Sequence, residues 1–282
     1  MQVCRDIKAL QKLCSKLEDI AFVPTMGALH KGHMSLISKA KASGKKTVVS
    51  IFVNRAQFNN EEDFNKYPQT EERDLSLLES CDPDIVFIPS EEEIYPEGFE
   101  KQVIAGKVAK EWEGADRPGH FDGVTTILAK FLNIIRPEVL WLGQKDAQQV
   151  AVVANMIRNL NFSVSLKVAP IVREADGLAY SSRNVRLSKF DRQRAPEIYR
   201  GLKKVRAAFE KGERQSSSLE SILRDSFKEA GLPNPEYAAL VDSRDFSLVK
   251  EASDSSLAIV AMCLGKVRLL DNFKMKEEPH EW

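Results

Sequence analysis

Short apolar runs and helical segments alternate along the first half of the chain. Four apolar runs predict strands, at residues 20–23, 48–53, 85–88 and 139–142. The run VVSIFV is nearly continuous and β-branched, a pattern typical of a strand covered on both faces. Segments with apolar residues at helical spacing lie between and after these runs, at residues 33–42, 70–80, 123–135 and 147–160. Strands that alternate with helices indicate an α/β fold with a doubly wound parallel sheet.

The pattern changes after the turn signal Asp176-Gly177. A long charged segment predicts one helix over residues 189–209, and the polar residues 211–218 predict a loop. Three further apolar runs predict strands at 237–241, 257–264 and 267–270, the last two joined at Gly265-Lys266. We therefore expect a second, smaller α+β domain that begins near residue 172.

Composition and charge argue against several classes of function. With 41 Lys and Arg against 41 Asp and Glu, the chain has no net charge to attract nucleic acid or an anionic membrane, so any anion site must be local. The cysteines are scattered, which fits a reducing compartment and favours neither a zinc knuckle nor a disulfide framework. No stretch approaches the ~20 apolar residues of a membrane span, and the N-terminus lacks a signal-peptide pattern. We expect a cytoplasmic protein.

The strongest chemical signal is the segment PTMGALHKGH at residues 24–33, between a predicted strand and a predicted helix. Ligands of doubly wound sheets bind at such positions, and the N-terminus of a helix suits a phosphate. His30 and His33 can face the same way and donate to phosphate oxygens in a transition state. A structural pair of core or capping histidines is the alternative. The Lys-Ser/Thr of a P-loop and the H-E-x-x-H of a zinc protease are absent from this segment.

An amide and a carboxylate stand out in the next segments. Gln57 can hydrogen-bond a substrate carboxylate without the full positive charge that would stabilise its ground state, although an ordinary surface glutamine has the same pattern. Asp74, in the first turns of a predicted helix, is more often an acid favoured by the helix dipole than a metal ligand. The turn at residues 117–123 is either a lid or a plain helix start.

Two later segments offer groups for a nucleotide. In GQKDAQQ at residues 143–149, Lys145 can meet a phosphate, and Asp146 can bind a ribose hydroxyl or cap the next helix. In SSRN at residues 181–184, two hydroxyls and the guanidinium of Arg183 form a small anion grip. Solvated loops or a plain hydroxyl-containing turn are the alternatives.

Together, and in this order, these segments resemble the pantothenate synthetase (pantoate–β-alanine ligase) family. The resemblance covers about residues 20–272 and is more specific than any single motif. The matching stretches are PTMGALHKGH (24–33), SIFVN (50–54), YP-x-T (67–70), RPGHF-x-GV (117–124), GQKD-x-QQ (143–149), VREADGLA (172–179), SSRN (181–184), YAALVD (237–242) and RLLDN (268–272).

The resemblance implies a fold and a reaction. The fold is a Rossmann-like doubly wound parallel sheet of the H-x-G-H nucleotidyltransferase type at residues 1–171, which binds nucleotide and pantoate, and a smaller C-terminal lid domain at 172–282. In the implied reaction, pantoate attacks ATP to give pantoyl-adenylate and pyrophosphate, and β-alanine then displaces AMP to give pantothenate. The resemblance also implies Mg²⁺ on the phosphates and a homodimer.

Site roles are carried over from the same resemblance. The implied catalytic residues are His30, His33, Lys145 and Arg183. The implied ATP-binding residues are Met26, His30, His33, Gly143, Lys145, Asp146, Val172, Ser181, Ser182 and Arg183. The implied pantoate-binding residues are Met26, Gln57, Tyr67 and Gln149, and Asp74 is the implied outer partner of the metal.

Two positions depart from the family pattern. Arg55 stands where proline usually follows Val-Asn, which frees the backbone ahead of Gln57 and adds a charge near the pantoate carboxylate. Tyr180 stands where methionine usually precedes the two serines, and its ring either crowds the site or stacks beside the nucleotide. Two rival functions remain: an adenylyltransferase whose product keeps the nucleotide, and a nucleotide-binding protein without catalytic activity.

Overall fold

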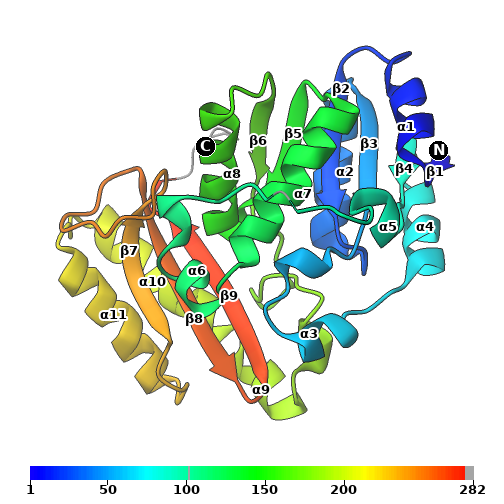
Figure 1. Cartoon of the computed structure of the whole chain (residues 1–282). Helices are drawn as coiled ribbons and strands as arrows, with labels where there is room; N and C mark the ends of the chain where they lie inside the picture. The colour runs from blue at the N-terminus through cyan, green and yellow to red at the C-terminus, as the bar shows by residue number, and fades with distance from the viewer. Residues whose placement is uncertain (101, 277–282) are drawn as a thin grey trace. The chain divides into compact units, whose positions relative to one another are not determined.

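A computed structural model describes residues 1–100 and 102–276 (Figure 1). Contacts within the chain define two compact units. Unit 1 comprises residues 1–143 and 152–169, and unit 2 comprises residues 144–151 and 170–282. Among the residues described, no helix has both the length and the apolar character needed to cross a membrane.

Unit 1 is built on a parallel sheet, which confirms the predicted fold class. In the described part of the chain this sheet has six strands in the order β1-β4-β3-β2-β5-β6. Their bounds are β1 Gln2–Cys4, β2 Ile20–Thr25, β3 Lys46–Ile51, β4 Ile85–Phe87, β5 Val139–Gly143 and β6 Ser165–Ala169. The chain runs outward from β2 through β3 to β4 and then returns to place β5 on the other side of β2, so the switch point lies between β2 and β5.

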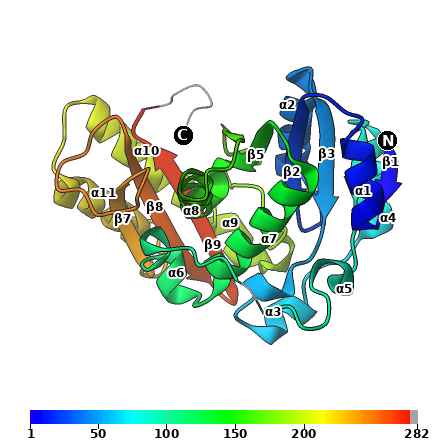
Figure 2. The ribbon, with the colours of Figure 1, turned by 45° about the horizontal axis from the view of Figure 1, so that its top comes forward.

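Helices cover both faces of this sheet (Figures 1 and 2). Successive residues of a strand point to opposite faces, which explains why the predicted runs are almost continuously apolar. Val23 belongs to a buried cluster with residues of α2 and α4, whereas Phe22, on the other face, meets the ring of Phe131 in α7 at a centroid distance of 5.6 Å. The helices are α1 Ile7–Cys14, α2 Lys31–Ala42, α3 Glu61–Asn65, α4 Glu71–Glu79, α5 Glu91–Ile94, α6 Glu113–Asp116, α7 His120–Ile135 and α8 Ala147–Asn159, with 3-10 turns η1 Arg55–Gln57 and η2 Lys107–Ala109.

Unit 2 contains an antiparallel sheet in the order β7-β8-β9, packed against α10 and α11. The three predicted strands are confirmed, and Gly265, at φ +58°, forms the predicted turn between β8 and β9. The elements are η3 Gln144–Asp146, η4 Asn184–Arg186, α9 Lys189–Arg194, α10 Glu197–Glu210, α11 Ser216–Glu229, β7 Tyr237–Asp242, β8 Ser256–Leu264 and β9 Val267–Lys274.

Two sequence-based expectations in unit 2 are wrong. The single helix predicted over residues 189–209 is two helices, because Pro196 lacks the N–H that would continue α9 into α10. The loop predicted over residues 211–218 is too long, since Ser216 already begins α11. That helix buries Leu219, Leu223 and Phe227, which lie four residues apart on one face.

Candidate functional site

The two histidines of the first segment form the beginning of α2. His30 is the N-cap, and its Nδ1 accepts a hydrogen bond from the Gly32 N–H at 3.1 Å. The Nδ1 of His33 accepts from the His30 N–H at 3.4 Å, and the two ring centroids lie 4.0 Å apart. An imidazole whose Nδ1 accepts a hydrogen bond carries its proton on Nε2 when neutral. Capping and phosphate binding are therefore compatible, because they use opposite nitrogens of each ring.

The loop before this helix has an unusual backbone. Gly27 and Ala28 both have left-handed conformations, at φ +76° and +49°. Their neighbour in space is the fully buried carboxylate of Asp74, which accepts from the Ala28 and Leu29 N–H groups at 2.8 Å each. The Thr70 hydroxyl, at the N-cap position of α4, donates to the same carboxylate at 3.1 Å. The side chain that the family resemblance implied as an outer partner of the metal is thus engaged with two backbone N–H groups and a hydroxyl.

Gln57 is buried and has a fixed amide orientation. Asn54 Nδ2 donates to Gln57 Oε1 at 3.1 Å and to the Gly123 carbonyl at 3.1 Å. Gln57 Nε2 therefore points the other way and lies 2.9 Å from the sulfur of Met26. Tyr95 Oη donates to Asn54 Oδ1 at 2.8 Å, and burial raises the pKa of Tyr95 to about 12, so that its proton is retained for this bond. The surface-glutamine alternative is wrong, since only 8% of Gln57 is exposed.

The segment at residues 117–123 is a helix start: α7 begins at His120. The His120 ring lies with Nδ1 2.7 Å from the Gln57 carbonyl oxygen. Gly123 packs directly on η1, where a Cβ atom would lie 2.3 Å from the Ala56 carbonyl oxygen and 2.6 Å from the Gln57 nitrogen. The first turn of α7 therefore fixes the backbone that carries Gln57.

Because of this contact, Gly123→Ala is expected to destabilise the protein by about 1–3 kcal/mol. The added methyl group meets backbone atoms, which cannot move aside as a flexible side chain would. Urea unfolding measures the change. Gly143→Ala is the matched control in the same unit, because a Cβ there meets only Leu36 Cδ1 at an ordinary 3.8 Å. Equal midpoints for the two variants would contradict the tight packing.

In unit 2, β9 holds the turn that carries Lys145. The side-chain amide of Asn272 donates to the carbonyls of Gln144 and Lys145 at 2.9 and 3.0 Å, and Gln144 Nε2 donates back to Asn272 Oδ1 at 3.2 Å. The Lys145 ammonium lies 3.2 Å from Asp146 Oδ1. The sequence pointed to Lys145 and Asp146 but gave no role to Asn272, which belongs to the stretch RLLDN.

A buried ion pair organises the segment at residues 172–184. Arg173 forms two hydrogen bonds with Asp271, at 2.7 and 2.9 Å, and its guanidinium carbon lies 3.7 Å from the ring centroid of Tyr199. The Tyr180 N–H donates to the Val172 carbonyl at 3.0 Å, which closes the segment into a loop. An arginine that donates two hydrogen bonds to one carboxylate and also stacks on an aromatic ring is held in a single orientation. Arg173 therefore fixes the start of this segment against β9.

The anion grip expected at residues 181–183 lies at the end of this loop. The Ser181 hydroxyl accepts from the Arg183 N–H at 3.3 Å, so the hydroxyl-containing turn is present. Asn184 ties it back, because its amide donates to Glu174 Oε1 at 3.1 Å and to the Ala179 carbonyl at 3.0 Å. The turn and the anion grip are again compatible.

The remaining predicted residues divide between the two units. In unit 1, Tyr67 is buried and packs on Phe58, next to Gln57, at 5.6 Å between ring centroids, and Gly143 ends β5 beside the switch point. In unit 2, Gln149 is half-buried in the first turns of α8. Unit 1 thus brings together Met26 with Gln57 and His30 with His33, and unit 2 brings together Lys145 with Asp146 and Ser181 with Arg183.

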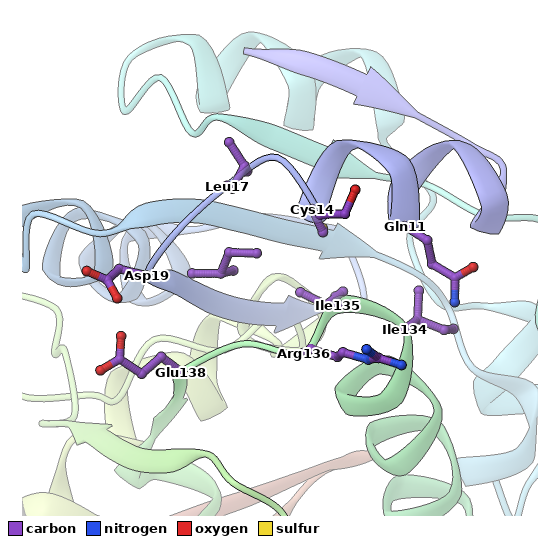
Figure 3. Close-up of a pocket in the computed structure, with 10 residues that line it drawn as sticks. Gln11, Cys14, Leu17, Asp19, Ile134, Ile135, Arg136 and Glu138 are labelled. Atoms are coloured by element: carbon purple, nitrogen blue, oxygen red, sulfur yellow. The ribbon is translucent and has the colours of Figure 1, made fainter.

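Two pockets of unit 1 lie at opposite ends of the sheet. One, of about 480 Å³, follows the carboxyl ends of β2, β3 and β4 and is lined by Met26, Gly27 and Asp74 among others. The other, of about 640 Å³, lies where α1 and α7 end and β2 and β5 begin (Figure 3). Of the residues that line this second pocket, none belongs to the set predicted from the sequence. The first pocket thus lies at the carboxyl ends of the strands and is lined by two of the predicted site residues, Met26 and Asp74.

Comparison with known proteins gives a consistent result. The family model for pantoate-beta-alanine ligase matches residues 2–274. The chain is 44% identical to a pantothenate synthetase of Gluconobacter oxydans, over 98% of this chain and 100% of that protein. It also resembles the crystal structure of pantothenate synthetase from Thermus thermophilus, with a TM-score of 0.92, 37% identity, and coverage of 98% of this chain and 100% of that one. A pantoate-beta-alanine ligase from Francisella tularensis, complexed with beta-gamma ATP and beta-alanine, has a TM-score of 0.81 and 35% identity, and 99% of each chain is covered.

Proposed function

The chain belongs to the pantoate–β-alanine ligase family and forms pantothenate from pantoate, β-alanine and ATP, and on this premise we propose which residues perform each step. The observation that carries the proposal is the pair of capping imidazoles at the start of α2. Their Nδ1 atoms accept from backbone, so their Nε2–H groups are set to donate to an anion.

The first step joins the pantoate carboxylate to the α-phosphorus of ATP. The bond between the α-phosphorus and the bridging oxygen breaks, and pyrophosphate leaves with that electron pair. A carboxylate must approach a polyanion here, so donors and cations around the phosphates lower the barrier. We assign this role to His30 and His33 of unit 1, and to Lys145, Ser181, Ser182 and Arg183 of unit 2.

Gln57 orients the pantoate. The side-chain oxygen of Gln57, Oε1, accepts a hydrogen bond from Asn54. The Nε2–H group is therefore the part of the side-chain amide that can meet a substrate oxygen. A neutral donor holds a carboxylate without quenching its nucleophilicity as a full positive charge would. Met26 packs against this amide, and Tyr67 and Gln149 complete the proposed set.

In the second step, the amine of β-alanine attacks the acyl carbon of pantoyl-adenylate. The new C–N bond forms, the acyl–oxygen bond breaks, and AMP leaves while the nitrogen loses a proton. We assign adenosine binding to Gly143, Asp146 and Val172. The adenylate reacts with water, and exclusion of water during this step would protect it; we propose that residues 172–282 act as the lid and residues 1–171 as the domain that binds nucleotide and pantoate.

Mg²⁺, when bound with ATP, would neutralise part of the negative charge of the phosphates. Among the described residues, no group of three or more His, Cys, Asp or Glu side chains is placed to hold a metal ion. Asp74 remains the predicted outer partner of the ion, and a homodimer in the cytoplasm remains the predicted state of the enzyme.

AMP release with each substrate omitted in turn tests the function. ATP and Mg²⁺ should give AMP and pantothenate only when pantoate and β-alanine are both present, with the products identified by mass spectrometry. A product that keeps the nucleotide would favour an adenylyltransferase. Binding of ATP without turnover would favour a nucleotide-binding protein that lacks catalytic activity.

Arg55→Pro is expected to lower the KM for pantoate and to stabilise the protein by about 0.5–1 kcal/mol. Arg55 begins η1, a position at which proline fits, and proline would stiffen the turn that carries Gln57. The guanidinium lost is exposed and pairs with Glu61 at 3.1 Å and with the Phe64 ring at 5.1 Å, contacts of small value at a surface. Arg55→Ala, which removes the same contacts without stiffening the backbone, is the control. Identical pantoate kinetics in the two variants would sink the idea.

A further inference from the structure

Asp74 is a buried carboxylate whose one role in the scheme above is that of a predicted outer partner of Mg²⁺. Its side chain has 0% exposure, and its two oxygens accept three hydrogen bonds. Oδ1 accepts from the Leu29 N–H, and Oδ2 accepts from the Ala28 N–H and the Thr70 hydroxyl. The early position of Asp74 in α4 adds the favourable field of a helix N-terminus. Among the contacts described, the Asp74 carboxylate has no cationic partner. Two backbone N–H groups, one hydroxyl and the helix N-terminus stabilise it instead.

The loop at residues 27–29 is shaped to receive this carboxylate. In the turn that these left-handed residues form, the N–H groups of Ala28 and Leu29 both point toward one carboxylate, and we call this anion-binding turn the nest. The anion in the nest is the protein's own Asp74. Gly27 permits the approach, because a Cβ there would lie 3.0 Å from Asp74 Oδ2. Ala28 has a side chain and still adopts φ +49°, a conformation that persists only when the surroundings enforce it.

The nest ends where the phosphate-binding pair begins. Leu29 donates to Asp74 and has its own side chain 1% exposed, and the next residue is the N-cap His30. The His33 ring is fixed in turn by the His30 N–H. Any drift of the nest would therefore move both imidazoles relative to the sheet.

We propose that Asp74 is a positioning residue that sets the two imidazoles by anchoring the backbone in front of them. This proposal rests on the proposed phosphate-binding role of His30 and His33. It differs from the outer metal partner implied by the family resemblance, because an anchor acts through backbone N–H groups and is indifferent to Mg²⁺.

Asp74→Asn is the test, since an amide of the same shape cannot accept on both atoms. Whichever way it is oriented, its NH₂ faces the N–H of Ala28 or Leu29. We expect kcat/KM for ATP to fall by about 10- to 100-fold, with the pantoate KM nearly unchanged and the Mg²⁺ dependence of the rate unaltered. Glu72→Gln, an exposed carboxylate change in the same helix, is the matched control and should behave as the parent.

Nuclear magnetic resonance provides a readout that is independent of turnover. The chain has four histidines, so their imidazole signals are separable. Asp74→Asn should shift the signals of His30 and His33, leave that of His120 in place, and speed amide exchange at Ala28 and Leu29. These changes do not depend on which reaction the enzyme catalyses. They therefore test the anchoring role of Asp74 separately from the proposed phosphate-binding role of His30 and His33.

Two results would overturn the proposal. One is a raised Mg²⁺ requirement with the rate restored at high Mg²⁺, which would make Asp74 a metal partner. The other is unchanged signals from His30 and His33 in a folded variant. If Asp74→Asn does not fold, Thr70→Val removes one of the three hydrogen bonds and should give the same shifts in smaller measure.

Discussion

His30→Asn is expected to lower kcat/KM for ATP by about 100- to 1000-fold while the enzyme keeps its fold. Asparagine is among the best N-cap residues, and its Oδ1 lies near the position of Nδ1, so the hydrogen bond from the Gly32 N–H is retained. It has no group at the position of Nε2, so the proposed donor to the phosphate is lost. Initial rates of AMP release measure the activity, and urea unfolding measures the stability.

The complementary variant is His30→Gln. Its amide nitrogen can reach the Nε2 position, but the longer side chain caps poorly, so we expect it to keep part of the activity and to lose about 0.5–2 kcal/mol of stability. The two variants thus separate the roles of the two ring nitrogens. Full activity in His30→Asn would show that His30 is only a cap, and the proposed role in phosphate binding would be wrong.

Lys145→Met is expected to reduce kcat/KM for ATP by a similar factor of about 100- to 1000-fold. Methionine keeps most of the length of the side chain and removes the positive charge that we propose binds the phosphates. The backbone of the turn should stay in place, because Asn272 holds the carbonyls of Gln144 and Lys145 rather than the Lys145 side chain. Steady-state kinetics with varied ATP measure the effect.

Lys266→Met is the control for this charge change, since Lys266 lies in the turn between β8 and β9 of the same unit. It should leave the ATP kinetics unaltered. Parent-like kinetics in Lys145→Met would remove Lys145 from the proposed phosphate-binding set. If Lys145→Met loses activity and Lys145→Arg retains it, the reaction needs a cation at this position.

The central strands could be predicted from the sequence, and the edge strands could not. Strands β2, β3 and β5 are buried on both faces and consequently have continuous apolar runs. Strand β1 has only three residues, and the first three of the five residues of β6 are exposed or half-buried, so neither strand has a strong apolar pattern. Both lie at the edges of the sheet. The start of α11 was hidden by its three serines, although Leu219 and Leu223 already had helical spacing.

A sequence can point to the site residues whose side-chain type and spacing indicate their chemistry directly. His30 and His33 were predicted in this way. The residues that hold the backbone beside the predicted site residues are hard to recognise in a sequence, because Asp74 lies 46 residues from Ala28 and Asn272 lies 128 residues from Gln144. The sequence marked Asp74 as an acid early in a helix, and the family resemblance implied it as an outer partner of the metal. The left-handed loop that defines its contacts is supplied by the fold.

The order of the strands also has a consequence for synthesis on the ribosome. Strands β1 to β4 emerge first, and β2 then forms an open edge of their sheet until β5 follows. An unpaired apolar edge invites association with other chains, and pairing across a long stretch of sequence is slow. The seam between β2 and β5 is therefore the point at which a nascent chain is most exposed to aggregation. The same switch point that suits the sheet for ligand binding is the part of unit 1 that a chaperone would have most reason to shield.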